Sequence, residues 1–263
     1  MNRIDLKFRQ LRKERRKAFI AFITAGDPSL QVTEELVLAL EKAGCDLIEL
    51  GVPFSDPMAD GPTIQAASER SLKKGTTLAK ILELVKRIRT KSDLPLALMT
   101  YYNPVFHQGE AAFVERAKKA GVDGLIIPDL PPEEAGDLIK ATAKNDMACV
   151  FFIAPTSKAE RMKTIAAASR GFIYYVSLTG VTGARTAMPD SLKSQLRLAK
   201  RITKKPICVG FGISTPQQVR EVGRLADGVI VGSAIIKEIE KHKGKKDLVP
   251  QVARFVQRLR RAL

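Results

Sequence analysis

The chain has few of the residues that most often bind metals. It contains no tryptophan, two histidines and three cysteines in 263 residues. The histidines, at positions 107 and 242, and the cysteines, at 45, 149 and 208, show no spacing typical of metal ligands. Three widely separated cysteines, each in or next to an apolar segment, indicate buried thiols in a reducing compartment. We therefore predict no metal site and a cytoplasmic location.

Long apolar runs are also absent. No stretch approaches the roughly 20 apolar residues that a membrane-spanning helix needs. The basic amino-terminal segment lacks the apolar centre of a signal peptide and carries Asp5 and Glu14, so we expect it to be a helix of the mature protein. We predict no membrane association.

Negative charge is scarce relative to positive charge. The 44 Lys and Arg residues outnumber 28 Asp and Glu, which gives a net charge of +16. Residues 1–17 hold eight basic and two acidic side chains, and residues 237–263 hold nine and three. Such clusters can bind nucleic acid. The chain has no interleaved aromatics and no nucleic-acid-binding motif, so we predict solvated basic helix faces and no nucleic-acid partner.

Short apolar segments alternate with amphipathic ones along the whole chain. The predicted strands are 18–24, 46–50, 95–102, 124–127, 147–153, 172–177, 206–210 and 228–231. The predicted helices are 3–16, 30–43, 63–74, 78–89, 109–120, 132–145, 157–169, 191–202 and 215–225, then a short helix after Gly232 and a terminal helix from about Asp247.

Eight βα units without a linker predict an α/β fold in which residues 1–263 form one (β/α)8 TIM barrel. The barrel would carry an extra amino-terminal helix and a short phosphate-binding helix after strand 8. The alternative is an open, doubly wound sheet. That fold should show a glycine-rich dinucleotide turn after the first strand, and "TAGDPS" is not one.

The catalytic groups of such a barrel lie at the carboxyl ends of its strands. These positions carry no lysine, no histidine and no cluster of metal ligands, which argues against Schiff-base and metal chemistry. Carboxylates and tyrosine remain for proton transfer, chiefly Glu49 at the end of "LIEL" and Asp60 in the next loop. A carboxyl group in an apolar strand should have a raised pKa, as a general acid requires.

Glycines follow the last two predicted strands, in "VGFGIS" and "IVGSAI". Backbone N–H groups and the start of a helix at Ser233 would bind an anion there, and "TGVTGA" could supply further amides. We predict a phosphate site. Apolar and aromatic side chains near the strand ends suggest that the substrate also carries a flat apolar group. They are Phe22, Met99, Tyr101, Ile126, Ile153, Tyr174 and Phe211.

Six motifs, in order and with the expected spacing, resemble the tryptophan synthase α subunit family. They are "LIELGVPFSDPMADGPTIQ", "LMTYYNP", "GVDGLIIPDLPPEE", "SLTGVTGAR", "VGFGIS" and "ADGVIVGSAI". The resemblance implies a lyase that cleaves indole-3-glycerol phosphate to indole and glyceraldehyde 3-phosphate. It implies an αββα complex in which the β subunit carries pyridoxal phosphate, while this chain needs no cofactor.

The resemblance also implies roles for individual residues. Glu49 would be the general acid/base at the indole C3, and Asp60 would accept a hydrogen bond from the indole N–H. Gly183, Gly212, Gly232 and Ser233 match phosphate-site positions, and the seven apolar residues above match the indole pocket. Thr182 lies in the loop that in the family closes over the substrate. Pro53, Asp56, Asn103, Asp129 and Pro131 lie in segments that face the β subunit.

Two other functions remain open from the sequence. The chain could be a non-catalytic subunit that only activates a β partner, or another phosphosugar-handling barrel such as an isomerase or epimerase. The presence of both Glu49 and Asp60 favours the lyase over the first alternative.

Overall fold

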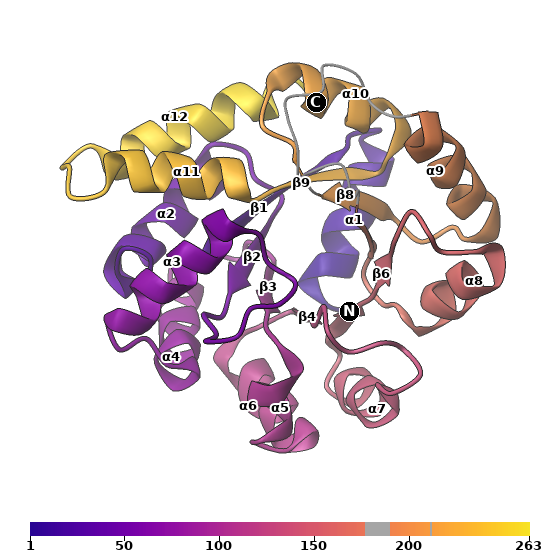
Figure 1. The fold of residues 1–263 in the computed structure, drawn as a ribbon, viewed down its shortest axis with the longest axis horizontal. Helices are drawn as coiled ribbons and strands as arrows, with labels where there is room; N and C mark the ends of the chain where they lie inside the picture. Colours follow the sequence, from indigo (N-terminus) through magenta and orange to yellow (C-terminus); the bar gives the residue numbers. More distant parts are fainter. Residues whose placement is uncertain (177–189, 211) are drawn as a thin grey trace.

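The strands of the protein form one parallel sheet that curves into a barrel. The computed structural model describes residues 1–176, 190–210 and 212–263. Within them the strands are β1 (Ala18–Thr24), β2 (Leu47–Gly51), β3 (Leu96–Met99), β4 (Gly124–Ile126), β5 (Ala148–Val150), β6 (Phe152–Ile153), β7 (Ile173–Val176), β8 (Ile207–Gly210) and β9 (Gly228–Val231). The sheet order is β5-β4-β3-β2-β1-β9-β8-β7-β6. The predicted barrel is confirmed, with helices arranged around the strands (Figure 1).

The predicted strand 147–153 is divided into β5 and β6 at Phe151. β5 pairs with β4, and β6 pairs with β7, so the two sides of this strand are hydrogen-bonded at different levels. The backbone N–H of Tyr174 donates to the Phe151 carbonyl at 3.0 Å, which joins β7 to the link between the two pieces. The barrel therefore closes at β5 and β6, which are consecutive in the chain. Because these two strands form one predicted strand, the nine described strands correspond to the eight predicted ones.

The helices occupy the outside of the barrel and one of its ends. They are α1 (Arg3–Lys13), α2 (Leu30–Lys42), α3 (Pro62–Lys73), α4 (Leu78–Arg89), α5 (Tyr102–Phe106), α6 (Glu110–Ala120), α7 (Gly136–Lys144), α8 (Ala159–Ala168), α9 (Asp190–Ile202), α10 (Pro216–Leu225), α11 (Ser233–His242) and α12 (Leu248–Arg260). None of these helices combines the length and hydrophobicity that crossing a membrane requires.

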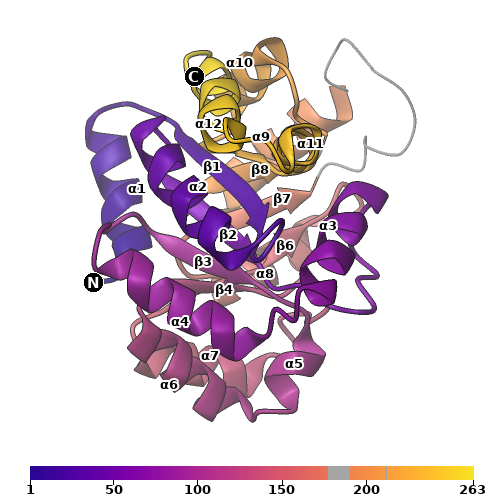
Figure 2. The same ribbon diagram turned by 90° about the vertical axis from the view of Figure 1, so that its left-hand side faces the viewer.

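Helix α1 closes the amino-terminal end of the barrel. Its buried face, Ile4, Phe8 and Leu11, packs into the interior cluster that contains the first residues of several strands. Asn2 caps the helix by accepting from the N–H of Ile4 at 2.8 Å, and its amide donates to the Asp123 carbonyl at 2.6 Å. Figure 2 shows α1 at one end of the barrel and α3 and α5 toward the other. The carboxyl ends of the strands therefore lie at the end opposite α1.

Several predicted boundaries are wrong, and two of the differences have a clear physical reason. The strand predicted over 95–102 ends at Met99, because the Asp129 carboxylate accepts the N–H of Tyr102 at 2.9 Å and the next residues form α5. The β propensity of the two tyrosines concealed this start of a helix. The helix predicted from 132 begins at Gly136, because the segment before it forms turns, in which the Glu134 N–H donates to the Pro131 carbonyl at 3.1 Å.

Candidate active site

The carboxyl ends of β1, β2 and β3 meet at a cleft in the barrel mouth. Strand β1 lies between β2 and β9, and β2 lies between β1 and β3. The cleft is narrow, and four of the predicted site residues line it: Phe22, Asp60, Met99 and Tyr101. Gly51, at the end of β2, lies on the same wall. The sequence-predicted residues thus converge on one end of the fold.

Glu49 lies deeper inside the barrel than this cleft. Gly51 lines the cleft, and Glu49, two residues earlier on β2, points to the same side of the strand because side chains alternate. Leu47, two residues earlier on the same side of β2, packs in one interior cluster with Tyr174 of β7 and Cys208 of β8, which places the Glu49 side chain inside the barrel. Glu49 is fully buried.

The Glu49 carboxyl group has no partner to stabilise its ionised form. Neither oxygen has a hydrogen-bond partner among the described residues. Burial without such a partner disfavours the charge and raises the pKa of Glu49 to about 8. The group therefore carries a proton at neutral pH and can deliver it to a substrate above it.

Asp60 has a different environment, in the loop between β2 and α3. Burial raises the pKa of Asp60 to about 6, and the hydrogen bond from Tyr101 opposes this rise. Tyr101 Oη lies 3.0 Å from Asp60 Oδ2. At neutral pH Asp60 is mostly ionised while Glu49 is mostly protonated, so the two groups can act as a hydrogen-bond acceptor and an acid at the same time.

Tyr174 forms the opposite wall of the barrel interior. Its burial, with the nearby charges of Glu49 and Asp60, raises the pKa of Tyr174 well above its usual range, so the phenol stays protonated. Gly210 leaves room for it, because a Cβ at this position would lie 2.3 Å from the Tyr174 hydroxyl. Ile126 belongs to the same interior cluster as Tyr174.

Strand β6 contributes a site residue that the sequence analysis did not predict. Phe152 packs against Tyr174, with ring centroids 4.9 Å apart, while Ile153 lies in the outer core between strands and helices. Alternation along β6 sends these neighbours to opposite sides. The strand period could have found Phe152, but the sequence alone did not fix which neighbour faces inward.

The glycines of the predicted phosphate site follow the carboxyl ends of β8 and β9. Gly212 has φ of +72°, a left-handed conformation that favours glycine. Gly232 is the N-cap of α11, and Ser233 is the exposed first residue of that helix. The first turn of a helix leaves backbone N–H groups available for an anion. Three other predicted residues, Thr182, Gly183 and Phe211, lie outside the described residues.

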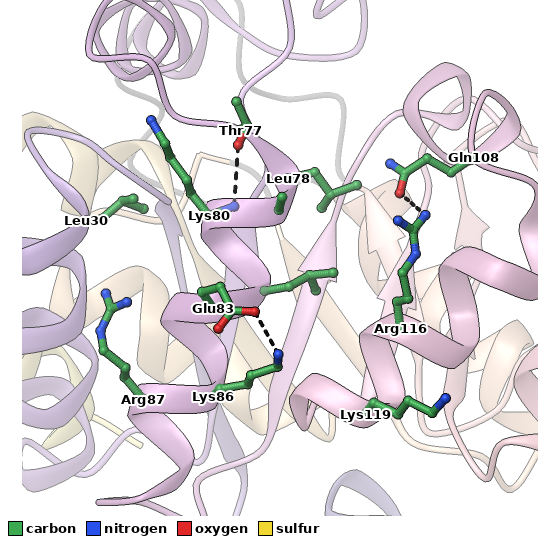
Figure 3. Close-up of a pocket in the computed structure, with 12 residues that line it drawn as sticks. Leu30, Thr77, Leu78, Lys80, Glu83, Lys86, Arg87, Gln108, Arg116 and Lys119 are labelled. Carbon is green, nitrogen blue, oxygen red and sulfur yellow. Dashed lines mark hydrogen bonds and ion pairs between the residues drawn. The ribbon is translucent and has the colours of Figure 1, made fainter.

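A larger groove lies away from these groups, on the outer surface between α4 and α6. It has a volume of about 710 Å³, and Figure 3 shows Lys80, Lys86, Arg116 and Lys119 around it. Lys86 pairs with Glu83 at 2.7 Å. The groove is open to solvent and contains neither carboxyl group of the barrel mouth. Within the described residues, no cluster of His, Cys, Asp or Glu could hold a metal ion.

Comparison with known proteins identifies the family of this chain. The sequence model of the family described as tryptophan synthase alpha chain matches residues 8–263. The tryptophan synthase alpha chain of Citrifermentans bemidjiense is 51% identical over 263 residues, which are 100% of this chain and 98% of that protein. The chain belongs to the tryptophan synthase α chain family. The corresponding protein of Caldanaerobacter subterraneus is 50% identical, with both chains fully covered.

Solved structures of the family share the fold. The α subunit from Legionella pneumophila strain Paris has a TM-score of 0.93 at 40% identity, covering 100% of this chain and 98% of that one. The tryptophan synthase complex from Pyrococcus furiosus has a TM-score of 0.85 at 39% identity, covering 92% and 97%. As a family member, this chain functions in tryptophan biosynthesis.

The segments of this chain that the family resemblance implies face the β subunit lie near the same end of the barrel. Asp56, Asn103 and Asp129 are exposed, and Pro131 is partly so. Pro53, which was expected in a segment that faces the β subunit, is buried, because it directly follows β2, where the Val52 N–H still donates to the Met99 carbonyl at 2.8 Å.

Two exposed apolar side chains were not predicted at this end. Met58, in the β2–α3 loop, is 82% exposed, and Phe106, in α5, is 67% exposed. Large apolar residues in segments rich in proline, glycine and aspartate are the signal that could have identified them. Ser68 and Ile64, one helical turn apart on α3, also line the cleft and were missed.

Proposed function

We propose that this protein cleaves indole-3-glycerol phosphate to indole and glyceraldehyde 3-phosphate. The observation that carries the proposal is the buried, unpartnered Glu49 beneath the mouth of a barrel of this family, with Asp60 above it. The reaction needs one carboxyl group that holds a proton and one that does not. The pKa values of about 8 for Glu49 and about 6 for Asp60 support that division at neutral pH.

The proton of Glu49 is delivered to the ring carbon C3. The electron pair of the C2–C3 double bond forms the new C–H bond, and the ring nitrogen then carries positive charge. Asp60 accepts the N–H hydrogen bond and stabilises this cation. The hydroxyl group on the adjacent glycerol carbon loses its proton to the Glu49 carboxylate, the C3–carbon bond breaks, and its electrons restore the indole. The other product is an aldehyde.

The phosphate group would be held at the opposite side of the mouth. Gly212, Gly232 and Ser233 would supply backbone N–H groups and a hydroxyl, and Gly183 completes the proposed phosphate set. Thr182 would belong to the loop that closes over the substrate. The apolar pocket for the indole would include Phe22, Met99, Tyr174 and Phe152, of which Phe152 joins the residues proposed from the sequence.

We propose a tryptophan synthase β subunit as partner, in an αββα complex. The Pyrococcus furiosus structure is titled a tryptophan synthase complex, and Met58 and Phe106 offer exposed apolar side chains near the barrel mouth. Pyridoxal phosphate would belong to the β subunit, and this chain would act without a cofactor. A cytoplasmic location fits the three free cysteines.

A panel of phosphorylated substrates tests the reaction. The isolated chain should release indole from indole-3-glycerol phosphate and leave pentulose phosphates unchanged. Turnover of a pentulose phosphate without indole release would indicate an isomerase or epimerase. Stimulation of a β subunit by a chain that itself releases no indole would indicate a non-catalytic subunit.

A further inference from the structure

Tyr101 is held rigidly where β3 gives way to α5. It is the N-cap residue of α5, with φ of −78° and ψ of 159°, and is 4% exposed. The Asp129 carboxylate fixes the next residue by accepting the N–H of Tyr102 at 2.9 and 3.1 Å. The Tyr101 ring stacks on Phe54 with centroids 5.2 Å apart. The phenol therefore has a fixed position at the barrel mouth.

The Tyr101 hydroxyl makes two hydrogen bonds to the β2–α3 loop. It lies 2.9 Å from the backbone nitrogen of Ala59 and 3.0 Å from Asp60 Oδ2. A backbone N–H can only donate, so the hydroxyl oxygen accepts from Ala59. The single hydroxyl proton is then directed at the carboxylate of Asp60. The donor and acceptor roles are fixed by the chemistry of the three groups.

The backbone of Asp60 is fixed, but its side chain depends on Tyr101. The Asp60 N–H donates to the Pro57 carbonyl at 3.0 Å, and its carbonyl accepts from Gln65 Nε2 at 2.8 Å. Among the described residues, the donor that reaches the carboxylate is Tyr101. Without it, a carboxylate on a loop could rotate about its side-chain bonds.

We propose that Tyr101 is a positioning residue for the reaction: its hydroxyl holds Asp60 Oδ2, so that Oδ1 remains available to the N–H of the indole. This inference rests on the function proposed above. A charge-assisted hydrogen bond of this kind also favours the ionised carboxylate, which is the form that accepts the N–H. Tyr101 thus acts through Asp60.

Replacing Tyr101 with phenylalanine removes the hydroxyl and keeps the ring that stacks on Phe54. Tyr101→Phe should lower kcat/KM about 10- to 100-fold, as loss of a hydrogen bond to a charged group does. The acidic limb of the pH profile of kcat/KM should move to higher pH, because Asp60 loses its donor. The matched control is Tyr102→Phe, which removes a hydroxyl 3.0 Å from Glu110 at the neighbouring position. Tyr102→Phe should leave kcat/KM and the acidic limb of its pH profile unchanged.

Binding of two non-cleavable analogues separates positioning from a structural role. Tyr101→Phe should weaken 3-(indol-3-yl)propyl phosphate about 10-fold or more, and its benzothiophene counterpart, which lacks an N–H, less than about 2-fold. Equal weakening of both would overturn the inference. The inference would also be overturned if Tyr101→Phe had the kcat/KM of the wild type and the same acidic limb in its pH profile. If the wild type itself released no indole, the proposed function would fail first, and the positioning role with it.

Discussion

At the residue scale, two carboxyl groups eleven residues apart in sequence differ in their hydrogen-bond partners. Glu49 is enclosed by the barrel and has no hydrogen-bond partner among the described residues, while Asp60 accepts a hydrogen bond from Tyr101. The sequence predicted both groups, because an acid in an apolar strand and an acid in the following loop are conspicuous. It could not predict Tyr101 as the partner of Asp60, because that contact joins loops 41 residues apart.

The pH dependence of the reaction follows from these environments. Activity needs ionised Asp60 and protonated Glu49, so kcat/KM should fall below about pH 6 and above about pH 8. Steady-state indole release between pH 5 and 9 measures the profile. A rate that rises continuously to pH 9 would contradict the assignment of Glu49 as the acid.

The buried carboxyl group should also affect stability. The pKa of Glu49 rises from 4.5 to about 8 on folding, so the folded state binds the proton more tightly. Ionised Glu49 therefore destabilises the folded state. The contribution of Glu49 to the free energy of unfolding falls as the pH rises from about 4.5 to 8 and is constant above that range. Glu49→Gln has no such group and should become more stable than the wild type across this window, by several kcal/mol.

Urea unfolding of both proteins at a series of pH values measures the effect. Other groups titrate in both proteins, so the difference between the two unfolding free energies isolates residue 49. A difference that does not change between pH 5 and 8 would show that the Glu49 pKa is not raised.

At the scale of elements, the alternation of strands and helices could be predicted from sequence, and the ends of elements could not. Leu78–Arg89 and Gly228–Val231 have the predicted bounds. The end of β3 depends on a hydrogen bond from the Tyr102 N–H to the Asp129 carboxylate, and the division of the predicted fifth strand depends on pairing with β4 and β7 at different levels. Both are tertiary interactions that no local pattern contains.

The contact between β1 and β2 gives a prediction at this scale. A Cβ on Gly51 would lie 2.5 Å from the ring of Phe22, so Gly51→Ala must displace a ring that lines the cleft. We expect a loss of about 1–3 kcal/mol of unfolding free energy, as overpacking costs, together with lower activity.

Chemical denaturation and indole release measure the two effects of Gly51→Ala. The control is Gly136→Ala at the start of α7, where no atom lies within 4 Å of the added Cβ. It should change stability by less than about 0.5 kcal/mol and leave activity intact. Equal behaviour of the two variants would contradict close packing at Gly51.

At the scale of the whole molecule, the barrel presents two different ends. Helix α1 closes one, while α5 and the β2–α3 loop surround the other with the exposed side chains of Phe106 and Met58. The family resemblance placed the partner segments at this second end. It did not identify these two residues, because exposure of an apolar side chain is decided by the fold.

Phe106→Ser should therefore weaken binding to the cognate β subunit about 10-fold or more, as loss of a buried aromatic at an interface does. Leu6→Ser is the control, since Leu6 is 50% exposed on α1 at the closed end. Calorimetric titration with the β subunit compares the two. Equal affinities would place the interface elsewhere, and neither change should affect indole release by the isolated chain.

The central claim is that the buried carboxyl group of Glu49 delivers the proton that breaks the bond. The most direct measurement is single-turnover indole release from indole-3-glycerol phosphate at pH 7, comparing the wild type with Glu49→Gln. Glu49→Gln fills the same space and should bind the phosphate analogue as the wild type does. Its rate should be about 10²- to 10⁴-fold lower, the usual contribution of a general acid. Release at the wild-type rate would contradict the account.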